Sequence, residues 1–205
     1  MVNIQNVFDI SVFKRSIKFL MFAVAITIVA TVTTYIINPN FEEIAEGIGN
    51  NLPDQVKESV GLKKVWAFIV NNGFIVPLQM FILALIPIQF LYLLNIISTV
   101  TLPGILFGIA LQASFKKGLG IIISAIPHYI FEVFAFCLFA AVLFKLNQVV
   151  RDKVRSVFKK AETGTSLIKN ILGTVKIYAI LILPIIILAA FMETYIADII
   201  FSLFE

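Results

Sequence analysis

The stretch LGIIISAIPHYIFEVFAFCLFAAVLF, residues 119–144, decides the fold class. It is apolar almost throughout its 26 residues, and about 20 apolar residues are enough to cross a bilayer as a helix. His128 and Glu132, near its middle, are its only residues that carry charge near neutral pH. A charge at that depth costs at least ~3 kcal/mol on insertion scales, so such residues usually face protein or water and serve a function.

The two titratable residues of this stretch belong together. They lie four residues apart, so they share one face of a helix. Pro127 directly precedes His128 and lacks the N–H that would close a helical hydrogen bond. The hexapeptide PHYIFE, residues 127–132, is therefore the strongest functional signal in the chain.

The composition of the whole chain indicates an integral membrane protein. Of its 205 residues, 60% are hydrophobic and only 14% are charged, whereas soluble domains have about 45–50% apolar and ~25% charged residues. The net charge of +4 comes from segments that flank apolar spans, so it does not indicate nucleic-acid binding. A single cysteine, Cys137, excludes a disulfide framework and a cysteine-based metal site. The N-terminus lacks the pattern of a cleavable signal peptide, and no cofactor is expected.

Five segments are long and apolar enough to be transmembrane helices. They are residues 19–37, one span within 65–97, and residues 99–115, 119–144 and 177–203. The second segment is too long for one simple span, so we expect its first part, residues 65–72, to lie along the membrane interface. The third is short and interrupted by Pro103 and Gly104. The prediction is an all-α polytopic fold with a cytoplasmic tail, residues 1–18, and a single transmembrane helical domain, residues 19–205.

Charge predicts the orientation. Residues 145–170 contain seven basic and two acidic residues, which favours a cytoplasmic loop, as for the N-terminal tail. Four spans separate these two segments, so both lie on one side, and the C-terminus is expected outside. The outer loop, residues 38–64, is expected to contain one amphipathic segment on the extracytoplasmic surface. Lys116 and Lys117 disagree with this topology, because they fall outside.

Polar groups recur in three spans. Glu193 lies in the fifth span, close to the small residues Ala189 and Ala190, which let another helix approach closely. The second span carries a set of amides: Asn71, Asn72, Gln79, Gln89 and Asn95. We therefore predict a polar core shared by the second, fourth and fifth spans.

Four interpretations of this polar core remain open. It is a structural network that fixes helix packing, or a path for protons or ions, for which imidazole beside a carboxylate is suitable chemistry. A metal site from His128, Glu132 and Glu193 is a third interpretation, although the chain has one histidine and lacks a His-Glu-x-x-His motif. An intramembrane protease using Ser124 is the fourth, but no Gly-x-Ser-x-Gly turn surrounds that serine.

Several polar positions follow one another in an order that is typical of one family. They are Asn71-Asn72 at the entry to a span, Asn95, Pro127-His128-x-x-x-Glu132, and Ala189-Ala190-x-x-Glu193-x-Tyr195. In this order, over residues 68–200, the chain resembles the stage II sporulation protein M family. It departs from the family at Leu85-Ile86-Pro87 and at Ile96, where the family tends to have glycines.

The resemblance implies a multi-pass protein of a prokaryotic cell membrane without an established catalytic activity. Founding members act with peptidoglycan-degrading partners during engulfment, and other relatives occur in circular-bacteriocin gene clusters beside an ATPase. We therefore predict a non-catalytic subunit that anchors or assembles partners: other membrane proteins, a second copy of the chain, a cytoplasmic ATPase or an extracytoplasmic cell-wall protein. The alternative is a transporter-like or permease-like subunit that uses His128 and Glu132 in a proton or substrate pathway.

Overall fold

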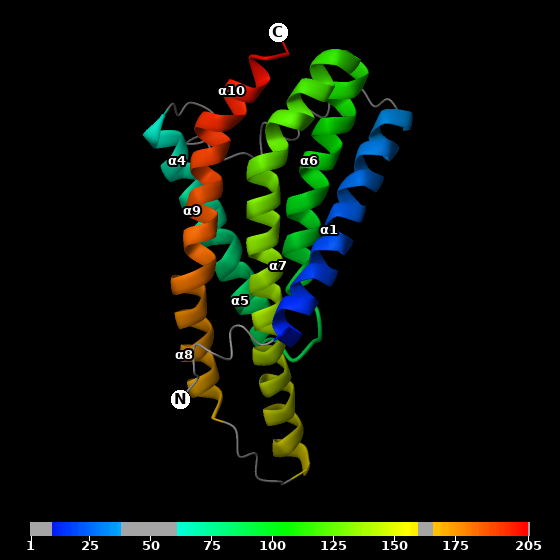
Figure 1. The fold of residues 1–205 in the computed structure, drawn as a ribbon. Helices are drawn as coiled ribbons and strands as arrows, with labels where there is room; N and C mark the ends of the chain where they lie inside the picture. The colour runs from blue at the N-terminus through cyan, green and yellow to red at the C-terminus, as the bar shows by residue number, and fades with distance from the viewer. Residues whose placement is uncertain (1–9, 38–60, 160–165, 205) are drawn as a thin grey trace.

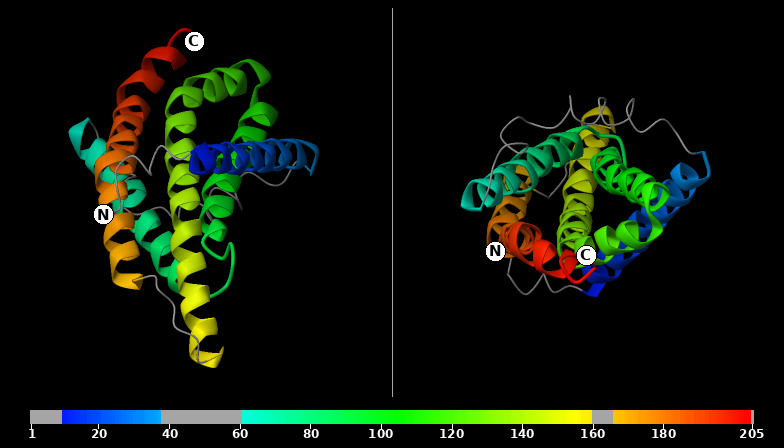
Figure 2. Two further views of the ribbon diagram at one scale, coloured as in Figure 1. Left: turned by 60° about the horizontal axis from the view of Figure 1, so that its bottom comes forward. Right: turned by 90° about the horizontal axis from the view of Figure 1, so that it is seen from above.

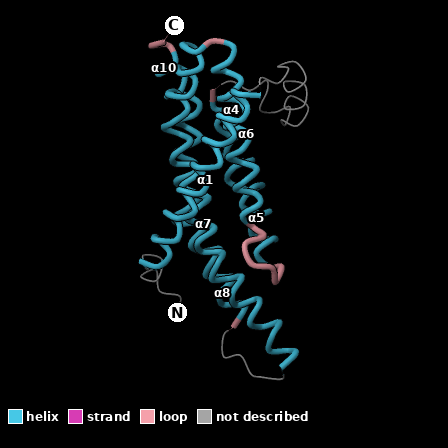
Figure 3. Tube along the Cα trace, turned by 90° about the vertical axis from the view of Figure 1, so that its right-hand side faces the viewer, coloured by secondary structure: helices cyan, strands magenta, loops and turns pink. Residues whose placement is uncertain are grey.

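The computed structural model describes residues 10–37, 61–159 and 166–204, and all regular structure within them is helical (Figure 3). Five helices are long and apolar enough to cross a membrane: Ile10–Ile37, Leu62–Leu85, Leu93–Ala113, Phe115–Ser156 and Leu167–Phe201. The predicted all-α polytopic fold with five spans is confirmed. The expected amphipathic segment of the outer loop falls on residues 38–60, outside the described residues.

Two of the spans are built from several helical pieces (Figure 1). The single-piece helices are α1 (Ile10–Ile37), α6 (Leu93–Ala113) and α7 (Phe115–Lys159). The second span joins α4 (Leu62–Phe68), the π-helical segment η2 (Ile69–Ile75) and α5 (Val76–Leu85). The last span joins α8 (Leu167–Ile177), π-helical η3 (Tyr178–Ile182), α9 (Leu183–Phe191), π-helical η4 (Met192–Ile196) and α10 (Ala197–Phe201).

Several predicted span limits were wrong. The third span is not short: α6 begins at Leu93, has 21 residues and continues through Pro103, so at 1.5 Å per residue it is about 31 Å long. Residues 65–72 are helical and continuous with α5, within the second candidate span Leu62–Leu85. Residues 145–159 extend α7 rather than forming a loop, because the sequence offers no proline or glycine there to end the helix.

Helix α7 is the centre of the bundle. All nine residues at positions 135–143 are buried, and a helix that is buried and apolar all round belongs in the interior. The helices α1, α5, α6, α8, α9 and α10 all pack against α7, which passes between them in the view from above (Figure 2). The outer faces of these helices expose many large apolar side chains, as a lipid-facing surface requires.

Helices α1 and α6 pack with close backbone contact. A Cβ added at Gly104 would lie 2.7 Å from the Cβ of Ala30. One added at Gly108 would lie 2.7 Å from the carbonyl oxygen of Thr31 and 2.7 Å from the Cβ of Thr34. Gly104 and Gly108 form a Gly-x-x-x-Gly pair, which lets two membrane helices approach until dispersion contacts join them.

The loop at residues 86–92, between α5 and α6, is fixed to α7 by a buried amide. Asn147 is 1% exposed, and its Nδ2 donates to the carbonyl oxygens of Ala84 at 3.0 Å and Ile86 at 2.8 Å. Arg151, one turn further along, donates from Nη1 to Oε1 of Gln89 at 2.9 Å. These bonds supply partners for carbonyl groups that the end of α5 leaves without helical donors.

The N-terminal end of α1 and the C-terminal half of α7 lie at one end of the bundle. The guanidinium of Arg15 stacks 3.8 Å above the ring of Phe144, and the rings of Phe13 and Phe134 are 6.4 Å apart. The C-terminus lies at the opposite end (Figure 1). Which end faces the cytoplasm stays a prediction from the charge pattern.

We predict that the substitution Gly108→Leu separates α1 from α6. The added side chain meets Thr31 and Thr34, and overpacking of this kind costs about 1–3 kcal/mol. The melting temperature of the purified protein in detergent should therefore fall by several degrees. Ala113→Leu, which enlarges an exposed residue of the same helix, is the matched control and should leave the melting temperature unchanged. Equal effects of the two substitutions would contradict the close packing.

We also predict that Asn147→Leu destabilises the loop at residues 86–92. The substitution leaves buried carbonyl groups without donors, at a cost of about 1–3 kcal/mol. Limited proteolysis should cut the chain in this loop faster in the variant than in the unaltered protein. Gln148→Leu changes the exposed neighbouring residue and should give the original cleavage rate. A protected loop in Asn147→Leu would show that the amide is not its anchor.

Candidate functional site

A cavity of about 600 Å³ lies among α5, α6, α7 and the π-helical segment η4. The second span and α6 diverge from the loop at residues 86–92, as Figure 1 shows, and α7 lies between them. Ten polar side chains line the cavity: Asn71, Asn72, Gln79, Asn95, Ser98, Thr99, His128, Tyr129, Glu132 and Glu193. These polar side chains belong to membrane-spanning segments, where polar groups usually serve a function, so the cavity is the candidate site.

The π-helical segment η2 carries Asn71 and Asn72 to the cavity. Asn71 Nδ2 donates to Asn72 Oδ1 at 2.7 Å. In an α-helix the Gly73 carbonyl would accept from residue 77, which is a proline without an N–H. The hydroxyl of Tyr178, at the start of η3, donates to that carbonyl instead. The last span thus stabilises the irregular backbone that presents the two asparagines.

The π-helical segment η4 contributes an acidic residue to the cavity wall. This segment interrupts the helix at Met192–Ile196 and carries Glu193. π-Helical turns of this kind occur frequently at functional sites. Ala189 and Ala190 are buried where α9 packs against α7 and α4, in agreement with their predicted role as close-contact residues.

Helix α7 supplies His128, Tyr129 and Glu132. Despite Pro127, α7 is a continuous helix here, so the four-residue spacing does place the imidazole and the carboxylate on one face. The hydroxyl of Tyr129 hydrogen-bonds to that of Thr27 on α1. Thr27 Oγ1 also donates to the carbonyl oxygen of Val100, at 3.1 Å. Tyr129 is therefore held from the side of α1 while its ring faces the cavity.

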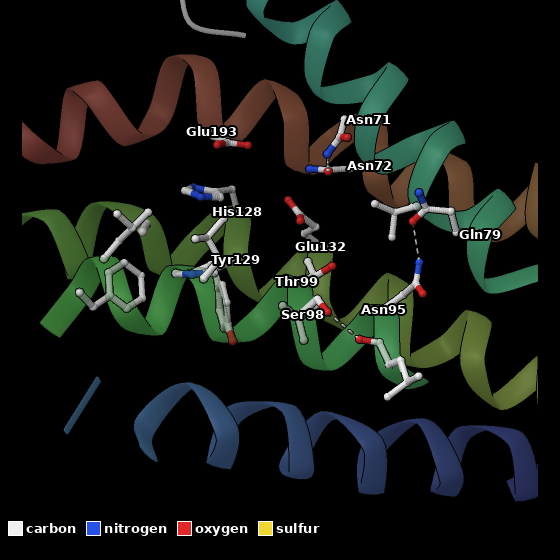
Figure 4. A pocket seen from close by; sticks show the side chains of 18 of the residues that line it. Asn71, Asn72, Gln79, Asn95, Ser98, Thr99, His128, Tyr129, Glu132 and Glu193 are labelled. Atoms are coloured by element: carbon white, nitrogen blue, oxygen red, sulfur yellow. Dashed lines mark hydrogen bonds between the residues drawn. The ribbon is translucent and has the colours of Figure 1, made fainter. Parts of the chain in front are cut away.

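The predicted buried His/Glu cluster that packs the helices together is not present. His128, Glu132 and Glu193 are each only partly buried, and no hydrogen bond or ion pair joins them within the described part of the chain. They face a shared space, with Glu132 pointing toward Asn72 (Figure 4). The physical reason is the divergence of the second span from α6, which leaves a cavity where the prediction placed a packed core.

Charged side chains interact with one another across the cavity. Glu132 and Glu193 act on one another, and the ammonium of Lys64 at the start of α4 acts on both Glu193 and His128. The Nδ1 atom of His128 is enclosed and has no hydrogen-bond partner among the residues that the structure describes. A buried polar atom without a partner is costly, at about 1–3 kcal/mol, and indicates a functional role or a bound group.

All six residues predicted for the polar cluster line this one cavity: Asn71, Asn72, Asn95, His128, Glu132 and Glu193. Gln89 does not, because it lies in the loop at residues 86–92, beside Arg151. Sequence reasoning missed Ser98, Thr99 and Tyr129. Ser98 and Thr99 follow Asn95 by one helical turn, and this spacing was the available signal.

Two other interpretations find no support in this geometry. In the described residues, no three histidine, cysteine, aspartate or glutamate side chains are close enough to hold a metal ion. Ser124 is buried outside the cavity, where its hydroxyl donates to the carbonyl oxygen of Ile121 at 2.8 Å. Its hydroxyl is therefore bonded to the backbone and does not face the cavity.

Comparison with known proteins identifies the family. No curated protein and no solved structure matches the chain. The model of the family described as stage II sporulation protein M matches residues 14–198, a range that contains every residue of the cavity lining. This chain belongs to the stage II sporulation protein M family.

Proposed function

We propose that this protein is a non-catalytic, permease-like membrane subunit in which the cavity binds a proton or the polar group of a small ligand within the membrane. The observation that carries the proposal is a cavity of about 600 Å³ that reaches His128, Glu132 and Glu193. A structural network would instead bring these groups into direct contact. The open arrangement therefore favours ligand or proton binding over helix packing.

The size and chemistry of the cavity support this proposal. Pockets for small organic molecules have volumes of about 300–1,000 Å³. An imidazole near two carboxylates is suitable for accepting and releasing protons. His128 lines the cavity, and its Nδ1 atom has no hydrogen-bond partner among the described residues, so no protein contact fixes the protonation state of the imidazole.

A second candidate function is the anchoring or assembly of partner proteins. It is supported by the C-terminal part of α7, which extends past the loop at residues 86–92 (Figure 1) and carries the exposed, charged Asp152 and Arg155. A cytoplasmic ATPase is the partner that would combine both functions, since it would dock on this extension and supply energy to the cavity. A cell-wall partner or a second copy of the chain would engage other faces.

We predict that His128→Ala abolishes proton movement through the reconstituted protein. The purified chain is placed in liposomes that contain a pH-sensitive dye, and the rate of pH change is measured after a potassium diffusion potential is applied. The imidazole is the only base of its type in the chain, so the protein-dependent rate should fall at least tenfold, which is about 1.4 kcal/mol in barrier height.

Ser124→Ala is the matched control for this measurement. It removes a polar group from the same helix, one turn from His128, but outside the cavity, and should leave the rate unchanged. An unchanged rate in His128→Ala would contradict the permease-like function. If His128→Ala also kept its rate while Arg155→Glu released a co-purifying membrane or cytoplasmic protein, the assembly function would be favoured.

A further inference from the structure

We infer that the cavity opens sideways into the bilayer and takes a membrane-dissolved amphiphile with a singly charged cationic head group. This inference deepens the proposed function, because it names the class of ligand for the same cavity. It depends on three observations: an exposed ridge that forms one wall, a narrow end where α5 and α6 are joined, and two carboxyl groups that face the interior.

The exposed wall is one ridge of α6. Leu94, Ser98, Leu102 and Leu106 recur every four residues, so they lie on one face of the helix. All four line the cavity and all four are also exposed, Leu94 by 53% and Leu106 by 42%. An exposed face in the middle of a membrane span meets hydrocarbon. The mouth of the cavity therefore opens toward the acyl chains between α5 and α6.

The cavity is narrow at the end nearest the loop at residues 86–92. Asn95 Nδ2 on α6 donates to Oε1 of Gln79 on α5 at 2.8 Å and joins the two helices where they converge (Figure 4). Below this bond, Asn147 fixes the loop to α7. A ligand consequently enters from the side, past the apolar ridge of α6, rather than through this end.

The interior of the cavity favours a cation. Glu132 and Glu193 face it from α7 and η4, and Lys64 is the only cationic side chain that acts on either carboxylate among the described residues. When both carboxyl groups are ionised, they outnumber this single ammonium by one charge. A protonated amine would neutralise that charge and donate hydrogen bonds to carboxylate oxygens, which are among the stronger hydrogen bonds in proteins.

The two parts of the ligand then have separate places. Its head group lies between Glu132 and Glu193, near the amides of Asn71 and Asn72 (Figure 4). Its hydrocarbon tail leaves past Leu102 and Leu106 into the bilayer. An anionic amphiphile would place like charges together, and a fully water-soluble molecule would have to cross the apolar ridge.

The test uses spin-labelled stearylamine in phosphatidylcholine vesicles that contain the reconstituted full chain. Electron paramagnetic resonance measures the fraction of label that is motionally restricted by the protein. Spin-labelled methyl stearate, with the same tail and no charge, is the reference probe, and spin-labelled stearate is the anionic one. Stearylamine should be retained about tenfold more strongly than either, the effect expected for one charge-assisted hydrogen-bonded contact.

Variants separate the head-group site from the mouth. Glu132→Gln and Glu193→Gln keep the shape of the side chains and should each reduce stearylamine retention toward that of methyl stearate. Ser98→Trp should reduce it by filling the mouth, whereas Ile82→Trp, at an exposed position of α5 outside the cavity, should not. The melting temperature of each variant, measured in parallel, identifies any that is unfolded.

Equal retention of the three probes, or retention that is unchanged in both glutamate variants, overturns the inference. Its failure is distinguishable from that of the proposed function. If stearylamine is not retained but proton flux still depends on His128, the cavity serves another ligand and only the inference falls. If stearylamine is retained at the two glutamates while flux is independent of His128, the inference stands and the permease-like function falls.

Discussion

The rest of the structure depends on the packing of the other helices around the buried middle of α7. Residues 135–143 are buried on every side, and the helices of all four other spans pack against α7, while α1 and α6 also pack closely against each other. Glu132 lies one turn before that segment and His128 two turns before it. The same rigid helix that organises the bundle therefore also fixes the floor of the cavity, and the site gains its geometry from the best-packed part of the fold.

Around this centre, the membrane imposes one requirement on every polar group. In hydrocarbon, backbone and side-chain polar atoms need partners within the protein. Asn147 meets this requirement for the end of α5, and Tyr178 meets it for the Gly73 carbonyl opposite Pro77. Three buried side-chain atoms lack a partner among the described residues: the Tyr92 hydroxyl, Arg151 Nε and His128 Nδ1. Of these residues, only His128 lines the cavity.

The sequence predicts the fold class and much of the cavity lining, because length, hydropathy and intramembrane charge are local properties. It locates His128, Glu132 and Glu193, but not whether they touch, since that depends on how far α5 and α6 diverge. The Gly104–Gly108 pair and Asn147 were missed for a related reason: a glycine or an amide acquires its role from the partner helix. The π-helical segments also escape prediction, because one additional residue in a turn leaves no clear signal in hydropathy.

The hydrogen bond between Tyr178 and Gly73 also has a mechanical consequence. It connects the last span to the same π-helical turn that holds Asn72 at the cavity wall. Because Gly73 directly follows Asn71 and Asn72 in the chain, a displacement of Tyr178 would move the backbone that carries both asparagines. The shape of this cavity wall is therefore coupled to the position of the last span.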